Sequence, residues 1–136
     1  SFHGDGELQE GQIWEAAMFA AALKIDKLIS FVDYNGKQID GPVDEVLSLG
    51  DLHAKWESFG WLVLETNGNN IEKLLETIKE AQSHTGKGKP VVVLMHTEMS
   101  YPIDFMMGTH KWHGNAPSDE QLSMALAQLP ETLGDY

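Results

Sequence analysis

Apolar positions along the chain recur with two different spacings. Residues 10–24 contain a helical stripe whose alanines favour close packing on a sheet: Ile13, Ala16, Ala17, Ala20 and Leu23. Residues 28–34, 61–67 and 91–96 are short, almost continuously apolar runs, which is typical of parallel strands covered on both faces. The pattern therefore predicts one long helix and three buried strands.

Three further helices are indicated by capping signals and amphipathic spacing. Asn70 is a candidate N-cap for a helix with one apolar face: Ile71, Leu74, Leu75 and Ile78. Residues 52–60 and 118–129 are predicted as two more helices, the second of them capped by Ser118. Because strands and helices alternate without a linker or repeat, we expect one α/β domain over residues 1–136, with a mostly parallel, doubly wound sheet and helices on both faces.

Composition and charge exclude several classes of protein. The 136 residues are 42% hydrophobic, which suits one globular core, and no apolar run approaches the ~20 residues of a membrane-spanning helix. The N-terminus lacks a signal-peptide pattern and the chain has no cysteine, so we expect a cytoplasmic protein. The net charge is −12 and all nine basic residues are lysines, which argues against nucleic-acid binding. Any anionic ligand must be held by backbone amides, histidine, lysine or a metal.

The segment HGDGELQEG (residues 3–11) places glycines and acids where a strand gives way to a helix. If GDG ends a strand, a helix over residues 10–23 runs roughly 21 Å away from it at about 1.5 Å per residue. A strand over residues 28–34 returns roughly 23 Å at about 3.3 Å per residue. A right-handed βαβ unit then brings Asn35 beside Asp5 at the carboxyl edge of the sheet, where such folds bind ligands.

The side chains of Asp5 and Asn35 carry hard oxygen donors that suit Mg²⁺ or Ca²⁺, and such a cation also coordinates diphosphate oxygens. Gly4 and Gly6 would let backbone amides approach the phosphates, and the following helix N-terminus favours negative charge. The residues therefore indicate a divalent cation that links these side chains to a diphosphate. The local pattern leaves an alternative open, in which GDG is only a turn and DYNG only a hairpin loop.

The sequence GDGELQEG, followed thirty positions after its aspartate by NGKQIDG, resembles the thiamine diphosphate signature of the transketolase family. LKIDKLISFVDYNGKQIDG, FGW and GTHKWHG extend the resemblance over nearly the whole chain and favour transketolase over pyruvate dehydrogenase and deoxyxylulose phosphate synthase. The length and ending resemble the N-terminal subunit of a split transketolase. Since the family places roughly half of its diphosphate-binding domain before the signature, the resemblance implies a thiamine diphosphate-binding fold that is incomplete at the N-terminus.

The resemblance also implies the residues of a cofactor site. Asp5, the Asn35 side chain and the Lys37 backbone carbonyl resemble the family's metal ligands; the lysine ammonium itself cannot ligate a cation. Gly6 resembles the glycine whose amide meets the diphosphate. Ile39 resembles the apolar residue that supports the bent cofactor, although its pattern suits a core residue equally well.

Two candidate catalytic residues follow from the resemblance. His113 resembles the histidine that contacts diphosphate and substrate, and Glu10 resembles a subunit-interface glutamate in a proton-linked carboxylate pair. Taken locally, a histidine beside a tryptophan is typical of simple packing, and Glu10 is a favourable acid in the first turn of a helix. His110 and His96 are weaker candidates, and HKWH offers no third ligand for zinc. The remaining histidines are expected at the surface: His3, His53 and His84.

The resemblance implies a thiamine diphosphate- and Mg²⁺-dependent transketolase of the pentose phosphate pathway, which moves a two-carbon ketol unit between sugar phosphates. The family's catalytic glutamate belongs to a pyrimidine-binding domain outside the matched region, so a complementary pyrimidine-binding subunit is implied, in a homodimer or heterotetramer. Two alternatives stay open: a noncatalytic, truncated domain with a structural role, and another thiamine diphosphate enzyme. Ser100 and Pro102 stand where the family commonly has glycines, which leaves loop closure and the choice of sugar undetermined.

Overall fold

Four parallel strands form the main sheet of the protein in a computed structural model, which describes residues 1–130. The strands are β1 (Phe2–Gly4), β2 (Ile29–Tyr34), β5 (Leu62–Asn67) and β6 (Val91–His96), in the order β1-β2-β6-β5. Because β6 pairs on both sides, its first four residues are at most 1% exposed. Its unbroken apolar run therefore reflects a strand covered on both faces.

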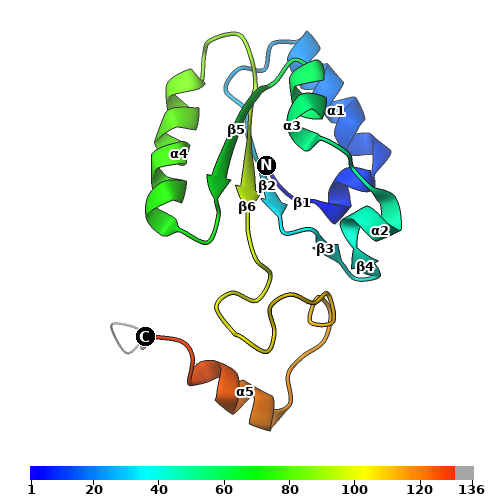
Figure 1. Ribbon diagram of the computed structural model, residues 1–136. Helices are drawn as coiled ribbons and strands as arrows, with labels where there is room; N and C mark the ends of the chain where they lie inside the picture. Colours follow the sequence, from blue (N-terminus) through cyan, green and yellow to red (C-terminus); the bar gives the residue numbers. More distant parts are fainter. Residues whose placement is uncertain (131–136) are drawn as a thin grey trace.

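Helices cover both faces of this sheet, which confirms the predicted doubly wound α/β architecture (Figure 1). On one face lie α1 (Gly11–Ala22) and α3 (Leu52–Ser58), and their buried side chains pack against alternate residues of the strands: Ala17, Ala20, Leu52, Trp56, Val32, Val92 and Leu94. On the other face lies α4 (Ile71–His84), with Ala81 packed in a cluster with Val91 and Val93. The buried residues of α1 are the small side chains Ala17 and Ala20, which belong to the core cluster on this face.

The capping residues predicted from the sequence begin two of the helices. Asn70 Oδ1 accepts the Lys73 N–H at 3.0 Å and so caps α4. Ser118 and Gln121 form a reciprocal capping box at the start of α5 (Asp119–Leu126), with distances of 3.3 and 2.9 Å. Each cap satisfies amides that the first helical turn leaves without partners. The helix α5 ends three residues earlier than the expected 118–129.

Four short elements were not predicted from the sequence. They are the 3-10 turn η1 (Gly6–Gln9), strands β3 (Lys37–Gln38) and β4 (Gly41–Pro42), and helix α2 (Val43–Leu47). Strands β3 and β4 pair with each other antiparallel in a separate two-stranded sheet. The DYNG segment therefore joins strands of two different sheets and is not a hairpin loop, which excludes that part of the local alternative.

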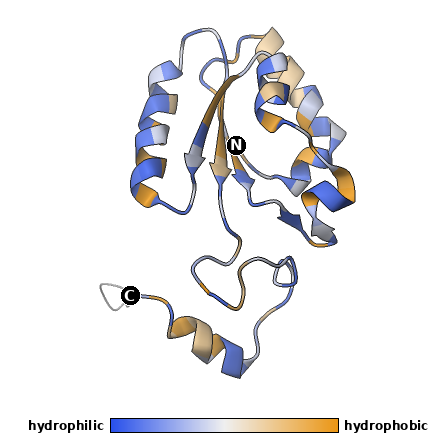
Figure 2. Cartoon of the chain, viewed as in Figure 1, coloured by the Kyte–Doolittle hydropathy of each residue, from blue (hydrophilic) through white to orange (hydrophobic). Residues whose placement is uncertain are grey.

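A connector without regular structure follows β6 and leads to α5. Figure 1 shows it beyond the carboxyl ends of the parallel strands, on the side where β3 and β4 lie. Two hydrogen bonds between Asp104 and Gln128, at 2.9 and 2.7 Å, join this connector to the residues after α5. Hydrophobic residues are concentrated in β5 and β6, whereas most of α4 is hydrophilic (Figure 2). Within residues 1–130, no helix is both long enough and apolar enough to cross a membrane.

Candidate functional site

The Asp5 carboxylate lies at the carboxyl edge of the sheet, where β1 pairs with β2. The Asp5 amide donates to the Asp33 carbonyl at 3.1 Å, which continues the pairing of the two strands. Asp5 is only 1% exposed; its Oδ1 accepts the Gly6 N–H at 2.8 Å and its Oδ2 accepts the Gly36 N–H at 2.5 Å. Asp5 therefore lies beside the Asn35–Gly36 turn, in the arrangement that the element lengths predicted.

Burial raises the pKa of the Asp5 carboxyl above its ordinary value, and the negative charge of Asp33 adds to the rise. The hydrogen bonds from Gly36 and Gly6 act in the opposite direction, but burial outweighs them. A cation beside Asp5 would stabilise the ionised carboxylate, because it would replace the solvation that burial removes.

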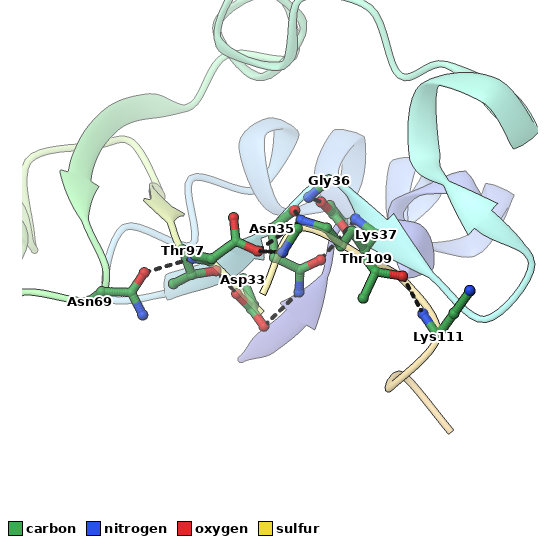
Figure 3. Close-up of polar contacts among 11 residues, drawn as sticks. Asp33, Asn35, Gly36, Lys37, Asn69, Thr97, Thr109 and Lys111 are labelled. Carbon is green, nitrogen blue, oxygen red and sulfur yellow. Dashed lines mark hydrogen bonds and ion pairs between the residues drawn. The ribbon is translucent and has the colours of Figure 1, made fainter. Parts of the chain in front are cut away.

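The Asn35 side chain is oriented by hydrogen bonds at both ends of its amide group (Figure 3). Its Nδ2 donates to Asp33 Oδ2 at 3.1 Å, while its Oδ1 accepts the Lys37 N–H at 2.8 Å. The other oxygen of Asp33 accepts a hydrogen bond from the Thr97 hydroxyl. Asp33 and Thr97 thus determine which end of the Asn35 amide presents oxygen toward Lys37.

The backbone N–H and carbonyl of Lys37, the first residue of β3, point away from the neighbouring strand β4. Lys37 lies opposite Pro42, and the Val43 N–H donates to the Gly36 carbonyl at 2.9 Å. In an antiparallel pair this hydrogen bond identifies Lys37 and Pro42 as a non-hydrogen-bonded pair. The Lys37 N–H is therefore free to bond Asn35 Oδ1, and its carbonyl also points away from β4. This geometry makes the carbonyl oxygen available as a ligand.

Glycine at position 6 is favoured by packing rather than by backbone angles. A Cβ atom there would lie 3.0 Å from the Cβ of Gln38, a tight contact that would push the 3-10 turn and β3 slightly apart. The amides of Gly6 and Gly4 both donate to carboxylates, of Asp5 at 2.8 Å and of Glu7 at 3.3 Å respectively. The side-chain oxygen of Gln38 is buried and has no hydrogen-bond partner within residues 1–130.

Ile39 and His110 line a second part of the site, whereas His113 is not among the residues that line it. Ile39 is 70% exposed in the β3–β4 turn, so it is not the core residue that its pattern also allowed. A cavity of about 270 Å³ is lined by Ile39, His110, Lys111, Gly114 and Asn115. His113 is exposed, and its N–H donates to the His110 carbonyl at 2.9 Å. Ile39 and the His110 segment therefore meet at one cavity.

Glu10 stands apart from the Asp5 network. It occupies the N-cap position of α1, is exposed, and its side chain makes no capping hydrogen bond. The local expectation was an acid within the first helical turn. In the structure α1 begins at Gly11, so Glu10 precedes the first turn. The carboxylate is therefore not engaged in capping its own helix.

One of the expectations for histidines needs correction. The His3 side chain is only 16% exposed and bonds Ser1 Oγ at 3.1 Å, so the surface assignment was wrong. His53 and His96 both contact the carboxylate of Glu65, at 2.5 and 2.6 Å, and these bonds lower the pKa of Glu65. In the part of the chain that the structure describes, no three His, Cys, Asp or Glu side chains are grouped to hold a metal.

The sequence did not reveal Asp33, Thr97 and Glu98 as parts of this site. Asp33 lies two residues before Asn35, and Thr97 and Glu98 directly follow β6. The available signal was topological, because the carboxyl ends of adjacent parallel strands lie at the same edge of a sheet. Once β2 and β6 are known to be neighbours, polar residues at both strand ends become candidates.

Ser100 has a backbone φ of +66°, in the left-handed region that favours glycine. We expect Ser100→Gly to stabilise the protein by about 0.5–1 kcal/mol, because relief of the left-handed penalty exceeds the entropy gained by the unfolded chain. Ser123→Gly in α5 is the matched control and should destabilise by a similar amount. Equilibrium urea unfolding measures both changes, and a destabilised Ser100→Gly variant would contradict the prediction.

Residues 1–131 match the family model "Transketolase, thiamine diphosphate binding domain". A subunit of the apulose-4-phosphate transketolase of Phocaeicola vulgatus is 38% identical over 130 residues, which are 96% of this chain and 46% of that protein. A 6-deoxy-6-sulfo-D-fructose transketolase subunit of a Clostridium species is 40% identical over 126 residues, 93% of this chain and 45% of that protein. The chain thus spans about half the length of these curated relatives.

Solved structures show the same fold. The transketolase of Campylobacter jejuni superposes with a TM-score of 0.84 at 29% identity, over 93% of this chain and 20% of that one. The transketolase of Pichia stipitis in complex with sedoheptulose-7-phosphate gives 0.82 at 32% identity, over 91% and 18%. Sequence and fold lead to one conclusion: this chain belongs to the transketolase family and corresponds to its thiamine diphosphate-binding domain.

Proposed function

We propose that this chain supplies the diphosphate-binding part of a Mg²⁺- and thiamine diphosphate-dependent transketolase that transfers two-carbon ketol units between sugar phosphates. The observation that carries the proposal is the buried Asp5 carboxylate, which lies against the Asn35–Gly36 turn at the carboxyl edge of the sheet. When bound, thiamine diphosphate supplies the electron sink for breaking and forming the carbon–carbon bond beside a ketose carbonyl.

The residues at this edge fit a hard divalent cation. The proposed ligands are the Asp5 carboxylate, the Asn35 Oδ1 and the Lys37 carbonyl, all oxygen donors of the kind that Mg²⁺ and Ca²⁺ prefer. Each carboxylate oxygen of Asp5 accepts one backbone N–H and Asn35 Oδ1 accepts one, so each keeps a lone pair. Burial raises the pKa of Asp5, and a cation bound beside it would act in the opposite direction by favouring the ionised form.

The neighbouring residues are proposed to bind the rest of the cofactor. The backbone amides of Gly4 and Gly6, which donate to the Glu7 and Asp5 carboxylates in this structure, are proposed to donate to the diphosphate when the cofactor binds. Ile39, exposed beside the cavity with His110, supports the bent cofactor, and the exposed His113 donates to diphosphate and substrate. Glu10, whose side chain makes no capping hydrogen bond, is proposed to form a contact between subunits.

A partner is proposed because two relatives are named as transketolase subunits. We infer that residues 1–136 form part of one diphosphate-binding domain and that catalysis needs a complementary pyrimidine-binding subunit. The chain has no arginine, so a guanidinium that binds the sugar phosphate must come from elsewhere in the assembly.

Calorimetric titration of the full-length protein with thiamine diphosphate, with Mg²⁺ or with EDTA, tests the proposal. We expect binding only with Mg²⁺, and ketol transfer between sugar phosphates only after the pyrimidine-binding subunit is added. Binding without transfer by the assembled complex would indicate a noncatalytic domain. Turnover of pyruvate instead of ketose phosphates would indicate a different thiamine diphosphate enzyme.

A further inference from the structure

The Glu98 carboxylate joins two segments that the proposed site needs and that are far apart in the sequence. Its Oε1 accepts a hydrogen bond from the Lys37 ammonium at 3.1 Å and another from the Gly108 N–H at 2.8 Å. Its backbone N–H donates to Asn69 Oδ1 at 2.6 Å, which fixes Glu98 where the chain leaves β6. One side-chain oxygen thus connects β3 with the connector that follows β6.

The segments on either side of Glu98 have different parts in the proposed site. Lys37 contributes its backbone carbonyl as a proposed cation ligand, and its side chain is only 15% exposed. Gly108 stands at the start of the GTHKWHG segment that carries His113. A change in the Glu98 contacts therefore alters the position of the connector relative to the cation ligands.

Glu98 also balances the charge of Lys37 close to the proposed cation. The Lys37 ammonium lies 3.5 Å from the Asn35 carbonyl, beside the turn that supplies the Asn35 ligand. Within residues 1–130, Glu98 is the single carboxylate that pairs with this ammonium. Without it, an unpaired positive charge would remain near the proposed cation and would weaken cation binding by repulsion.

We propose that Glu98 is a positioning residue with two separable effects: it holds the Gly108–His113 segment in place, and it neutralises Lys37 beside the cation site. The second effect rests on the proposed function, whereas the first does not. The first effect needs a side-chain oxygen that accepts the Gly108 N–H, whereas the second needs the negative charge of a carboxylate.

Three variants of the full-length protein with its partner subunit separate the two effects. Glu98→Gln keeps an acceptor for the Gly108 N–H but removes the charge, and Glu98→Ala removes both. Glu98→Ala combined with Lys37→Met also removes the unpaired ammonium and keeps the Lys37 carbonyl. Glu80→Ala on the exposed face of α4 is the matched control.

Amide hydrogen exchange of the connector, measured without cofactor, reports the first effect. We expect Gly108 to exchange at least tenfold faster in Glu98→Ala, and to be largely protected again in Glu98→Gln. Unchanged exchange in Glu98→Ala would overturn the positioning role. This readout needs no cofactor, so it stands even if the proposed function fails.

The Mg²⁺ concentration that half-saturates thiamine diphosphate binding reports the second effect. We expect it to rise about tenfold in Glu98→Ala and Glu98→Gln, and to return close to the wild-type value when Lys37→Met is added. The control Glu80→Ala should match the wild type in both measurements. If Lys37→Met does not lower the half-saturating Mg²⁺ concentration of Glu98→Ala, the charge-balancing role is wrong. If the wild-type protein binds no cofactor, the proposed function is wrong, and the Gly108 exchange rate alone tests the positioning role of Glu98.

Discussion

Replacing Asp5 by alanine is expected to weaken Mg²⁺-dependent binding of thiamine diphosphate by about 100-fold or more, with the fold retained. The carboxylate is the one proposed cation ligand with a full negative charge, and it is buried between β1 and the Asn35–Gly36 turn. Its loss leaves the Gly6 and Gly36 amides without this acceptor, at a cost of about 1–3 kcal/mol for each amide that stays buried. Removal of a buried carboxylate whose pKa is raised by burial offsets part of that cost.

Calorimetric titration and thermal unfolding with and without Mg²⁺ measure the two effects of Asp5→Ala separately. The matched control is Asp51→Ala, because Asp51 also accepts a backbone N–H, from Ala54 at 2.9 Å, but does so at the N-cap of α3. That control should lose about 1 kcal/mol of stability and keep its cofactor affinity. A folded Asp5→Ala protein with wild-type affinity would remove Asp5 from the site.

Replacing Gly68 by alanine should weaken cofactor binding, although Gly68 is not one of the proposed ligands. A Cβ at this position would overlap Thr97 Cγ2 and lie 3.0 Å from Met95 Cβ, which is too close for both neighbours to stay in place. Rotation of the Thr97 side chain away from the new methyl group would break its hydroxyl bond to Asp33, and Asp33 orients the Asn35 amide. We expect a destabilisation of about 1–3 kcal/mol and a roughly tenfold weaker Mg²⁺-dependent cofactor affinity.

Thr97→Ser supplies the matched control for Gly68→Ala, because serine keeps the hydroxyl group and lacks the methyl group that would clash. The single Thr97→Ser variant should bind the cofactor as the wild type does. The double variant should recover most of the affinity and stability that Gly68→Ala alone loses, as measured by titration and urea unfolding. Equal losses in the single Gly68→Ala and the double variant would show that Thr97 does not transmit the effect.

The sequence correctly predicted the helices and strands whose signals are local. The buried strands and the main helices are placed within a few residues of their observed bounds because apolar periodicity and caps such as Asn70 and Ser118 act over one or two turns of chain. The strands β3 and β4 have two residues each, which is too short for any periodicity. The His3 assignment was wrong because its burial depends on residues of α1 and β2 that line the same cavity: Ile13, Ala16 and Ser30.

By itself, the sequence determined the α/β class, the signature residues and the meeting of Asp5 with the Asn35 turn. That meeting follows from the lengths of the elements together with the right-handed βαβ rule, since one helix leads away from the carboxyl edge and one parallel strand returns to it. The tertiary structure alone showed how Asp33, Thr97 and Glu98 surround the turn. Thr97 lies 64 positions from Asp33, and Glu98 lies 61 positions from Lys37. These pairs meet because β6 pairs beside β2, a choice of neighbour that no local pattern encodes.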